Sequence, residues 1–475
     1  MNKQNDLIQH PTGKYANVGF SLIRMAACIL AGLLLTSPML GAEDKITDQP
    51  GPAVRIVTLN EALAVAADRN KNIKKALEYK NYVMGRYVEE RAAALPQFSL
   101  TGKVARSRDE TQKVLYEGIP PQQQVYNSQI NVSQVIFTWG QIGAAIRAAE
   151  IGMKTADDQI DRFRQAVAKD VSTAFYDVLL TKELMATARQ TLELKSLHLE
   201  EARRKYAAGT ATDYDVLAAE VSVKNARPNV INTENAVQIA RERLAILLGG
   251  EGRRYDVDGS LEVQIAPLPE YRQAVLTALK RRPELAEVRH RLGMQEELIT
   301  VAKGGDKPRL DLQAYYGRQN LEMGSNQGDG ELAAGGIFLT FPFFDGLRTN
   351  GKVAQAVSDF KTLTIEEARF KDDISLQVFE AHNDLKSSGA IVSALSGTVA
   401  QAEKLLDMAN KGFTYGVKTN LDVQDAQLHL EEARAQLAKA RRDYLVAGVA
   451  LKWVTGTIEL PSPKAFESAA QDKEG

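Results

Sequence analysis

Residues 374–413 read ISLQVFEAHNDLKSSGAIVSALSGTVAQAEKLLDMANKGF, and the spacing of small and apolar residues in this segment indicates the architecture of the chain. Small or apolar residues recur in it at alternating spacings of four and three positions, and no proline occurs between residues 343 and 460. Such a seam predicts a very long α-helix that packs against a neighbouring helix as in a coiled coil. The seam positions are Ile374, Val378, Ala381, Leu385, Ser388, Val392, Leu395, Val399, Ala402, Leu406, Ala409 and Phe413.

The same seam occurs 207 positions earlier, over residues 167–206. Segments further towards the N-terminus of each copy are related by an offset of 212, so the offset changes by five only inside a predicted loop. Two long stretches of constant offset predict a duplicated unit of about 210 residues. Matched pairs are Gly209 and Gly416, Thr212 and Thr419, Asp215 and Asp422, and, at the offset of 212, Pro96 and Pro308.

Each copy follows one plan: a helical segment, two short strands around a polar loop, a very long helix and a returning helix. Period-two alternation of apolar and polar residues predicts the strands, and glycine predicts the turn between the helices. In the first copy we expect a helical segment at about 58–94, strands within about 97–137 around a loop at 107–126, and helices at 140–208 and 213–248. In the second copy we expect a helical segment at 268–305, strands within about 309–343 around a loop at 318–334, a long helix ending near 415 and a returning helix at 420–455. The fold class is mainly α with a small β part.

These segments predict the domain organisation of the chain. We expect a first repeat at 58–248, a linker at 249–267 that includes the run Gly249-Gly250-Glu251-Gly252, and a second repeat at 268–456. The repeats are preceded by a signal peptide at 1–42 and an N-terminal extension at 43–57, and they are followed by a disordered tail at 457–475.

The N-terminus has the order of a secretory signal. Positive charge up to Arg24 precedes an apolar run at 25–35, which ends before small residues at Gly41-Ala42. Eleven apolar residues are too few to span a bilayer, which takes about 20. The alternative is an uncleaved N-terminal anchor. Cys28, the one cysteine of the chain, lies within this segment, so we expect a mature chain without cysteine, which forms neither a disulfide nor a cysteine zinc site.

Composition excludes several classes of function. The chain of 475 residues has 59 Lys and Arg against 60 Asp and Glu, so it lacks the basic excess of a nucleic-acid-binding protein. Its four histidines beyond the N-terminal segment have no metal-ligand spacing, and the Gly249–Gly252 run lacks the residues of a phosphate loop. No arrangement of nucleophile, base and acid emerges from the spacing. We therefore expect no enzyme activity, no cofactor and no bound metal.

The strands suggest contact with an outer membrane. Four strands cannot close a barrel, and open edges cannot lie in lipid, so several chains would have to combine their strands. Aromatic residues gather at the strand ends, as in the interfacial girdle of an outer-membrane protein. The alternative is that they belong to a core at the strand–helix junctions. These residues are Tyr126, Phe137, Trp139, Tyr315, Tyr316, Phe341, Phe343 and Phe344.

Several local motifs, taken in order, resemble the TolC family of outer-membrane efflux proteins over residues 55–460. They are Thr58-Leu59-Asn60-Glu61-Ala62-Leu63, Phe137-Thr138-Trp139-Gly140, Ala245-Ile246-Leu247-Leu248-Gly249, Phe344-Asp345-Gly346, Trp453-Val454-Thr455-Gly456, and the stretch from Gly416 to Asp425. The resemblance implies a homotrimer whose twelve strands form one β-barrel in outer-membrane lipid, continued by a coiled-coil α-barrel through the periplasm. It also implies a periplasmic adaptor (membrane fusion) protein and an inner-membrane RND, ABC or MFS transporter as partners. The chain would be the passive exit duct of tripartite efflux or type I secretion.

The turn at Gly416 carries the candidate site. Asp422 and Asp425 lie three positions apart on one face of the returning helix, and in a trimer each would form a ring of three carboxylates. The resemblance places the tunnel constriction on these two residues. The alternative is ordinary helix capping.

The resemblance also places gating contacts on Lys418 and Phe413, paired with Asp215. The best-known family pattern has arginine and tyrosine where this chain has Lys418 and Phe413. Lysine lacks the planar fork of arginine, and phenylalanine donates no hydrogen bond, so we expect a less tightly held closed state.

A competing hypothesis is a periplasmic coiled-coil adaptor or structural protein without a pore. The duplicated strand pairs argue against it, because an adaptor needs one helical hairpin flanked by small β domains. The sequence does not identify the substrate, which could be a drug, a metal ion or a protein.

Overall fold

The computed structural model describes residues 54–111, 121–250 and 253–461. Every described helix and strand belongs to one compact unit, which begins at Ala53. The predicted signal peptide at 1–42 with Cys28, most of the predicted extension at 43–57, and most of the predicted tail at 457–475 lie outside the described residues.

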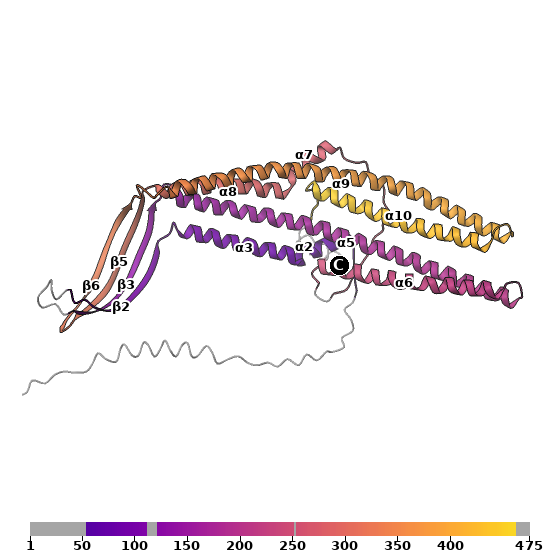
Figure 1. Ribbon diagram of the computed structural model, residues 1–475, viewed down its shortest axis with the longest axis horizontal. Helices are drawn as coiled ribbons and strands as arrows, with labels where there is room; N and C mark the ends of the chain where they lie inside the picture. The colour runs from indigo at the N-terminus through magenta and orange to yellow at the C-terminus, as the bar shows by residue number, and fades with distance from the viewer. Residues whose placement is uncertain (1–53, 112–120, 251–252, 462–475) are drawn as a thin grey trace, which may run out of the picture. The chain divides into compact units, whose positions relative to one another are not determined.

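The helices and strands repeat along the chain as the offsets predict (Figure 1). The first copy consists of α2 (Leu59–Arg69), α3 (Lys71–Ala92), β2 (Gln97–Arg108), β3 (Gln122–Phe137), α5 (Gln141–Ala207) and α6 (Asp213–Leu247). The second consists of α7 (Tyr271–Arg281), α8 (Pro283–Lys303), the 3-10 turn η1 (Gly304–Asp306), β5 (Arg309–Met323), β6 (Asn326–Thr340), α9 (Arg348–Thr414) and α10 (Asn420–Val454). Both long helices have 67 residues and both returning helices have 35. At 1.5 Å per residue the long helices measure about 100 Å.

Each predicted first helical segment is divided into two helices. Asn70 ends α2 and begins α3: its Oδ1 accepts from the backbone N–H of Asn72 at 2.9 Å, and its Nδ2 donates to the carbonyl of Leu247 at 2.8 Å. In the second copy Arg282 separates α7 from α8, because proline at position 283 keeps the preceding residue extended. The segments predicted as helical at 58–94 and 268–305 are thus helical, each with one break.

The four long strands form one antiparallel sheet in the order β2-β3-β5-β6. The predicted loop at 318–334 was wrong, since β5 continues to Met323, β6 begins at Asn326, and Gly324 turns with φ of +61°. These polar residues pair across the hairpin, as Arg318 does with Asp329. Backbone pairing of this kind needs no apolar side chains, so the polarity of the segment was misleading.

One face of this sheet is apolar and exposed in the single chain. Leu100 pairs with Ile130, and Ile130 pairs with Tyr316, in one row across three strands. Their exposed fractions are 76%, 51% and 57%. All eight aromatic residues of the predicted girdle are exposed as well, so they form no core at the strand–helix junctions.

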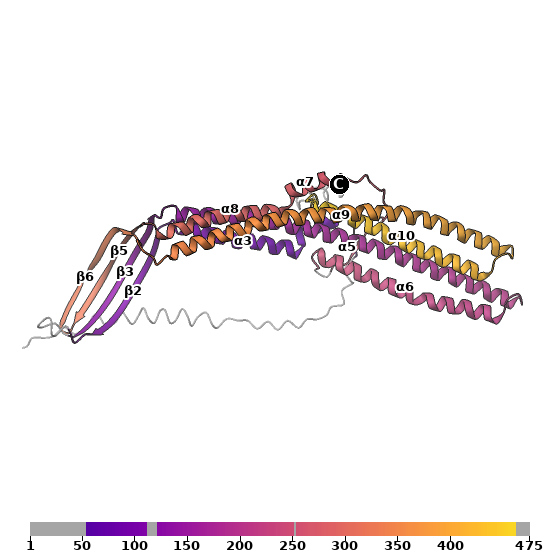
Figure 2. The same ribbon diagram turned by 45° about the horizontal axis from the view of Figure 1, so that its top comes forward.

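The main core lies in the middle of the unit, where α2, α5 and α6 enclose a small parallel sheet of β1 (Arg55–Val57) and β4 (Tyr255–Val257). From there smaller clusters follow the predicted seam between α9 and α10, in which Ile374, Val378 and Val392 are almost fully buried. The strands and the turns between the long and returning helices lie at opposite ends of α5 and α9 (Figures 1 and 2). Within the described ranges, no helix combines the length and apolarity that a membrane crossing requires.

Candidate functional site: the helix turns

The two helix turns are built alike around glycine. Gly209 and Gly416 have φ of +75° and +74°, a conformation that glycine adopts without a steric penalty. The N–H of Gly209 bonds to the carbonyl of Tyr206 at 2.9 Å, and that of Gly416 bonds to the carbonyl of Phe413 at 3.0 Å. These bonds close the ends of α5 and α9, so the chain reverses within a few residues.

A reciprocal capping box then starts each returning helix. The hydroxyl of Thr419 accepts from the N–H of Asp422 at 3.2 Å, and the Asp422 carboxylate accepts from the N–H of Thr419 at 2.8 Å. Thr212 and Asp215 make the same bonds at 3.3 and 2.8 Å. Two otherwise unpaired backbone donors are satisfied in each turn.

The capping boxes keep both carboxylates ionised. The pKa of Asp422 is lowered from its ordinary value to about 2, chiefly by the hydrogen bond from the Thr419 backbone, then by the Thr419 hydroxyl and the Lys418 ammonium. The pKa of Asp215 is lowered by the Thr212 backbone and hydroxyl. Helix capping therefore accounts for the position of Asp422, which was one of the two interpretations of this residue. It does not account for Asp425, which takes no part in the capping box.

Lys418 lies within its own turn. Its Nζ is 3.2 Å from Oδ1 of Asp422, and its stem passes over Gly412, where a Cβ would come within 2.6 Å of Lys418 Cγ. In the described part of the chain Lys418 thus pairs with Asp422 rather than with Asp215.

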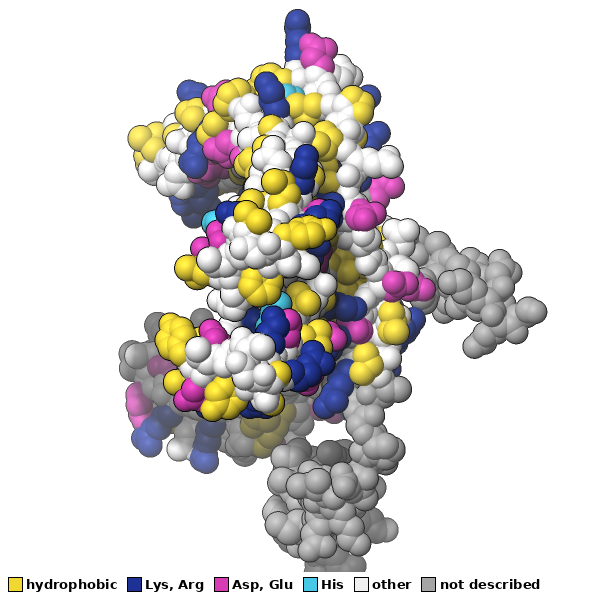
Figure 3. Space-filling view, turned by 90° about the vertical axis from the view of Figure 1, so that its right-hand side faces the viewer, with side chains coloured by type: hydrophobic (Ala, Val, Ile, Leu, Met, Phe, Trp, Pro, Cys, Tyr) yellow, Lys and Arg dark blue, Asp and Glu magenta, His cyan; other side chains and the backbone are white. Residues whose placement is uncertain are grey.

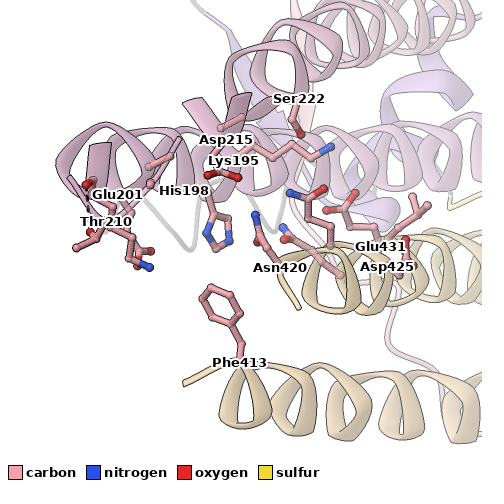
Figure 4. A pocket seen from close by; sticks show the side chains of 17 residues that line it. Lys195, His198, Glu201, Thr210, Asp215, Ser222, Phe413, Asn420, Asp425 and Glu431 are labelled. Atoms are coloured by element: carbon pink, nitrogen blue, oxygen red, sulfur yellow. Dashed lines mark hydrogen bonds and ion pairs between the residues drawn. The ribbon is translucent and has the colours of Figure 1, made fainter. Parts of the chain in front are cut away.

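A cavity of about 430 Å³ lies between the two helical hairpins near these turns. It brings together three of the five predicted site residues, Asp215, Phe413 and Asp425, whereas Lys418 and Asp422 lie outside its lining. Figure 4 shows His198 reaching from α5 towards Phe413 and Asn420, with Asp425 on α10. Most of the remaining lining is polar, so this space suits water and charge rather than an apolar ligand.

Sequence reasoning missed Lys205, which also lines the cavity. Its Nζ lies 5.2 Å from the centroid of the Phe413 ring and 2.8 Å from Oε1 of Glu201. The repeat contained a signal for it: position 205 corresponds to Gly412, so the duplicated turns differ here. Seen towards the turns, charges of both signs alternate with apolar side chains on the surface (Figure 3).

No group of three or more metal-ligating side chains that could hold an ion occurs among the residues described. The region of the turns thus brings together carboxylates, lysines and one aromatic ring.

Known proteins match this chain along most of its length. A sequence model of the outer membrane efflux protein family matches residues 62–250 and 275–457. The outer membrane efflux protein BepC of Brucella suis is 24% identical over 440 residues, covering 91% of this chain and 90% of BepC. The cobalt-zinc-cadmium resistance protein CzcC of Cupriavidus metallidurans is 26% identical over 388 residues, covering 81% and 86%. The alkaline protease secretion protein AprF of Pseudomonas aeruginosa is 26% identical over 385 residues, covering 78% of each.

Solved structures share the fold. The CmeC outer membrane channel of Campylobacter jejuni superposes with a TM-score of 0.72 at 14% identity, covering 90% of this chain and 94% of CmeC. A membrane protein from Pseudomonas aeruginosa gives 0.71 at 20% identity, covering 86% and 99%. The duplicated family match and the shared fold support a channel and give no support to the poreless adaptor. The chain therefore belongs to the TolC-type outer membrane efflux protein family, as a non-enzymatic channel of the outer membrane that extends into the periplasm.

Proposed function

We propose that three copies of this chain assemble into one exit duct. The observation that carries the proposal is the apolar row of Leu100, Ile130 and Tyr316, which is exposed on a four-stranded sheet with two open edges, β2 and β6. Open edges in lipid leave backbone groups unsatisfied, so the sheet must join others. Three sheets of four strands give a twelve-stranded barrel with its apolar face towards lipid and its polar face towards the lumen.

The polar face supports the same orientation. Side chains on alternate positions bond to one another: Asn131 donates across to Thr101 on β2 at 2.8 Å, and Gln129 donates to Asn131 along β3 at 2.7 Å. Such a network suits the water-filled interior of an outer-membrane barrel. The aromatic residues at the strand ends, including Trp139 and Phe343, would then lie at the membrane interfaces.

We infer that the helix turns carry the constriction of the duct, at Asp422 and Asp425. Around a threefold axis each residue would contribute a ring of three carboxylates, which attract cations and repel one another. The lowered pKa of Asp422, which Thr419 and Lys418 of the same turn cause, supports a charged carboxylate at that position in each chain. Asp215, Lys418 and Phe413 would hold the turns in the closed arrangement.

The chain would then work with partners that deliver the substrate. In this proposal a periplasmic adaptor docks at the turn end and links the duct to an inner-membrane transporter of the RND, ABC or MFS class. The names of the relatives refer to efflux, metal resistance and protease secretion, so the same passive duct could serve small substrates or proteins. The repeats at 58–248 and 268–456, joined by the linker at 249–267, would each contribute one strand pair and one helical hairpin.

Membrane fractionation and bilayer recording test the assembly. Fractionation is expected to place the protein in the outer membrane as a heat-modifiable oligomer. Chemical cross-linking of the purified protein should give species of up to three chains and none larger. In a planar bilayer it should give discrete conductance steps. A monomer in the periplasmic fraction, or an oligomer of another size, would refute the proposed trimer.

A further inference from the structure

We propose that Lys205 of α5 and Phe413 of α9 form a latch between the two helical hairpins of one chain, in which the Lys205 ammonium lies against the face of the Phe413 ring. The distance of 5.2 Å from Nζ to the ring centroid is within the range of a cation–π contact. This inference rests on the proposed function, because it names the residues that keep the turn end narrow. Phe413 can make this contact although it lacks the hydroxyl group of tyrosine, because the ammonium interacts with the face of the ring.

The Lys205 ammonium is held in place by its own hairpin. Oε1 of Glu201, one turn earlier on α5, lies 2.8 Å from Nζ of Lys205. An ammonium group has three N–H donors, so it can bond to the carboxylate and contact the ring at the same time. The carbonyl of Lys205 accepts from the N–H of Thr210 at 2.9 Å, which ties this residue to the turn. A cation in the last turn of a helix is also favoured by the helix dipole.

The duplication shows that this lysine is not part of the repeated turn. At the offset of 207, Lys205 corresponds to Gly412, and Lys418 corresponds to Ala211. The second turn therefore carries its lysine in the loop, where the lysine pairs with Asp422 of the same hairpin. The first turn carries its lysine on the long helix, where it faces the other hairpin.

Among the residues that the structure describes, few other polar contacts join the hairpins near the turns. The cavity separates them, and two buried atoms in it, Nε2 of Gln427 and Oε1 of Glu431, have no hydrogen-bond partner. Farther along the helices, Arg442 forms an ion pair with Asp177 of the other hairpin at 2.5 Å, and the charges of Arg441 and Glu183 also interact. A single contact at the turn end therefore strongly affects the distance between the ends of the two hairpins, and with it the width of the opening.

Bilayer recording of the full-length protein tests the latch. Lys205→Met keeps the aliphatic stem and removes the charge, and Phe413→Leu keeps an apolar residue and removes the ring. Each is expected to raise the open fraction about two- to fivefold, the factor that corresponds to an exposed cation–π contact. The double variant should be no more open than either single variant, since both remove the same contact. Phe413→Tyr and Lys205→Arg retain a ring and a cation, so they should remain near the wild type.

A matched control is available on α6. Lys224 pairs with Glu220 at 2.9 Å, with the same i,i+4 geometry as Lys205 and Glu201 but without a ring contact. Lys224→Met should therefore leave the open fraction unchanged. Equal effects of Lys205→Met and Lys224→Met, or additive effects in the double variant, would overturn the latch.

Hydrogen–deuterium exchange gives a second measurement that does not depend on conduction. Lys205→Met should accelerate exchange about twofold or more at residues 411–420, which lie on the other hairpin and contain no substitution. Unchanged exchange there would also overturn the latch. If the wild type fails to conduct but this coupling is present, the latch stands and the proposed duct is wrong.

Discussion

Asp215 and Asp422 occupy the same position of a duplicated helix turn, 207 residues apart, and their carboxylates make the same bonds. Each accepts from the backbone N–H of a threonine at 2.8 Å and from the hydroxyl of that threonine, at 2.8 Å for Asp215 and 2.7 Å for Asp422. One was predicted as a gating contact and the other as part of the constriction. The structure gives both the same local task, which is to begin the returning helix.

The first prediction concerns these caps. Thr419→Val removes the hydroxyl from the capping box, so the amides at the start of α10 should exchange about fivefold faster, as expected for an N-cap of typical strength. Thr212→Val should do the same at the start of α6 and leave α10 unchanged. Hydrogen–deuterium exchange of the purified protein measures both. Equal acceleration at both turns from a single substitution would contradict two independent caps.

The second prediction concerns acid. The pKa of Asp422 is about 2 in the folded chain and 3.8 ordinarily, so its contribution to folding is fully present above pH 3.8 and is lost as the pH falls through about 2. Exchange at the start of α10, corrected for the intrinsic effect of pH, should therefore accelerate between about pH 4 and pH 2. The variant Asp422→Asn should lose this pH dependence. A wild type with no change in this interval would refute the assignment.

The third prediction concerns glycines at the other end of the returning helices. Gly249 and Gly456 are also 207 residues apart, with φ of +114° and +66°. A Cβ on Gly249 would lie 2.9 Å from the Cβ of Arg69, and one on Gly456 would lie 2.9 Å from the backbone of Arg281. Alanine at either position combines a strained φ with a clash, so each should lower the free energy of unfolding by about 1–3 kcal/mol.

The control for this pair is Gly85 in α3, where a Cβ would meet nothing within 4 Å. Gly85→Ala should be neutral or stabilise by up to about 1 kcal/mol. Denaturant unfolding followed by circular dichroism compares the three variants. If Gly85→Ala lowered the free energy of unfolding as much as Gly456→Ala does, the strained φ and the clash would not explain the loss of stability.

Much of the fold could be predicted from the sequence because it rests on period and repetition. The seam from Ile374 to Ala409 and the glycines at the turns give local signals that the structure confirms. The strands at 318–334 could not be predicted in this way, since their pairing satisfies the backbone across the hairpin, whatever the polarity of the side chains. The contact of Lys205 with Phe413 joins two hairpins, so neither helix alone contains a signal for it.

The last prediction distinguishes the two aspartates of the proposed constriction. Asp422 is engaged by its capping box and is partly neutralised by Lys418 at 3.2 Å, whereas Asp425 lines the cavity and belongs to no cap. Asp425 is thus the freer carboxylate to receive a cation. Block of the conductance by a trivalent cation should weaken about tenfold in Asp425→Asn, a change of about 1.4 kcal/mol, and less in Asp422→Asn. Planar-bilayer titration of the blocking cation measures both affinities. Equal losses of blocking affinity in the two single variants would mean that Asp422 binds the cation as readily as Asp425 does. Unchanged block in the double variant would show that neither residue forms the constriction.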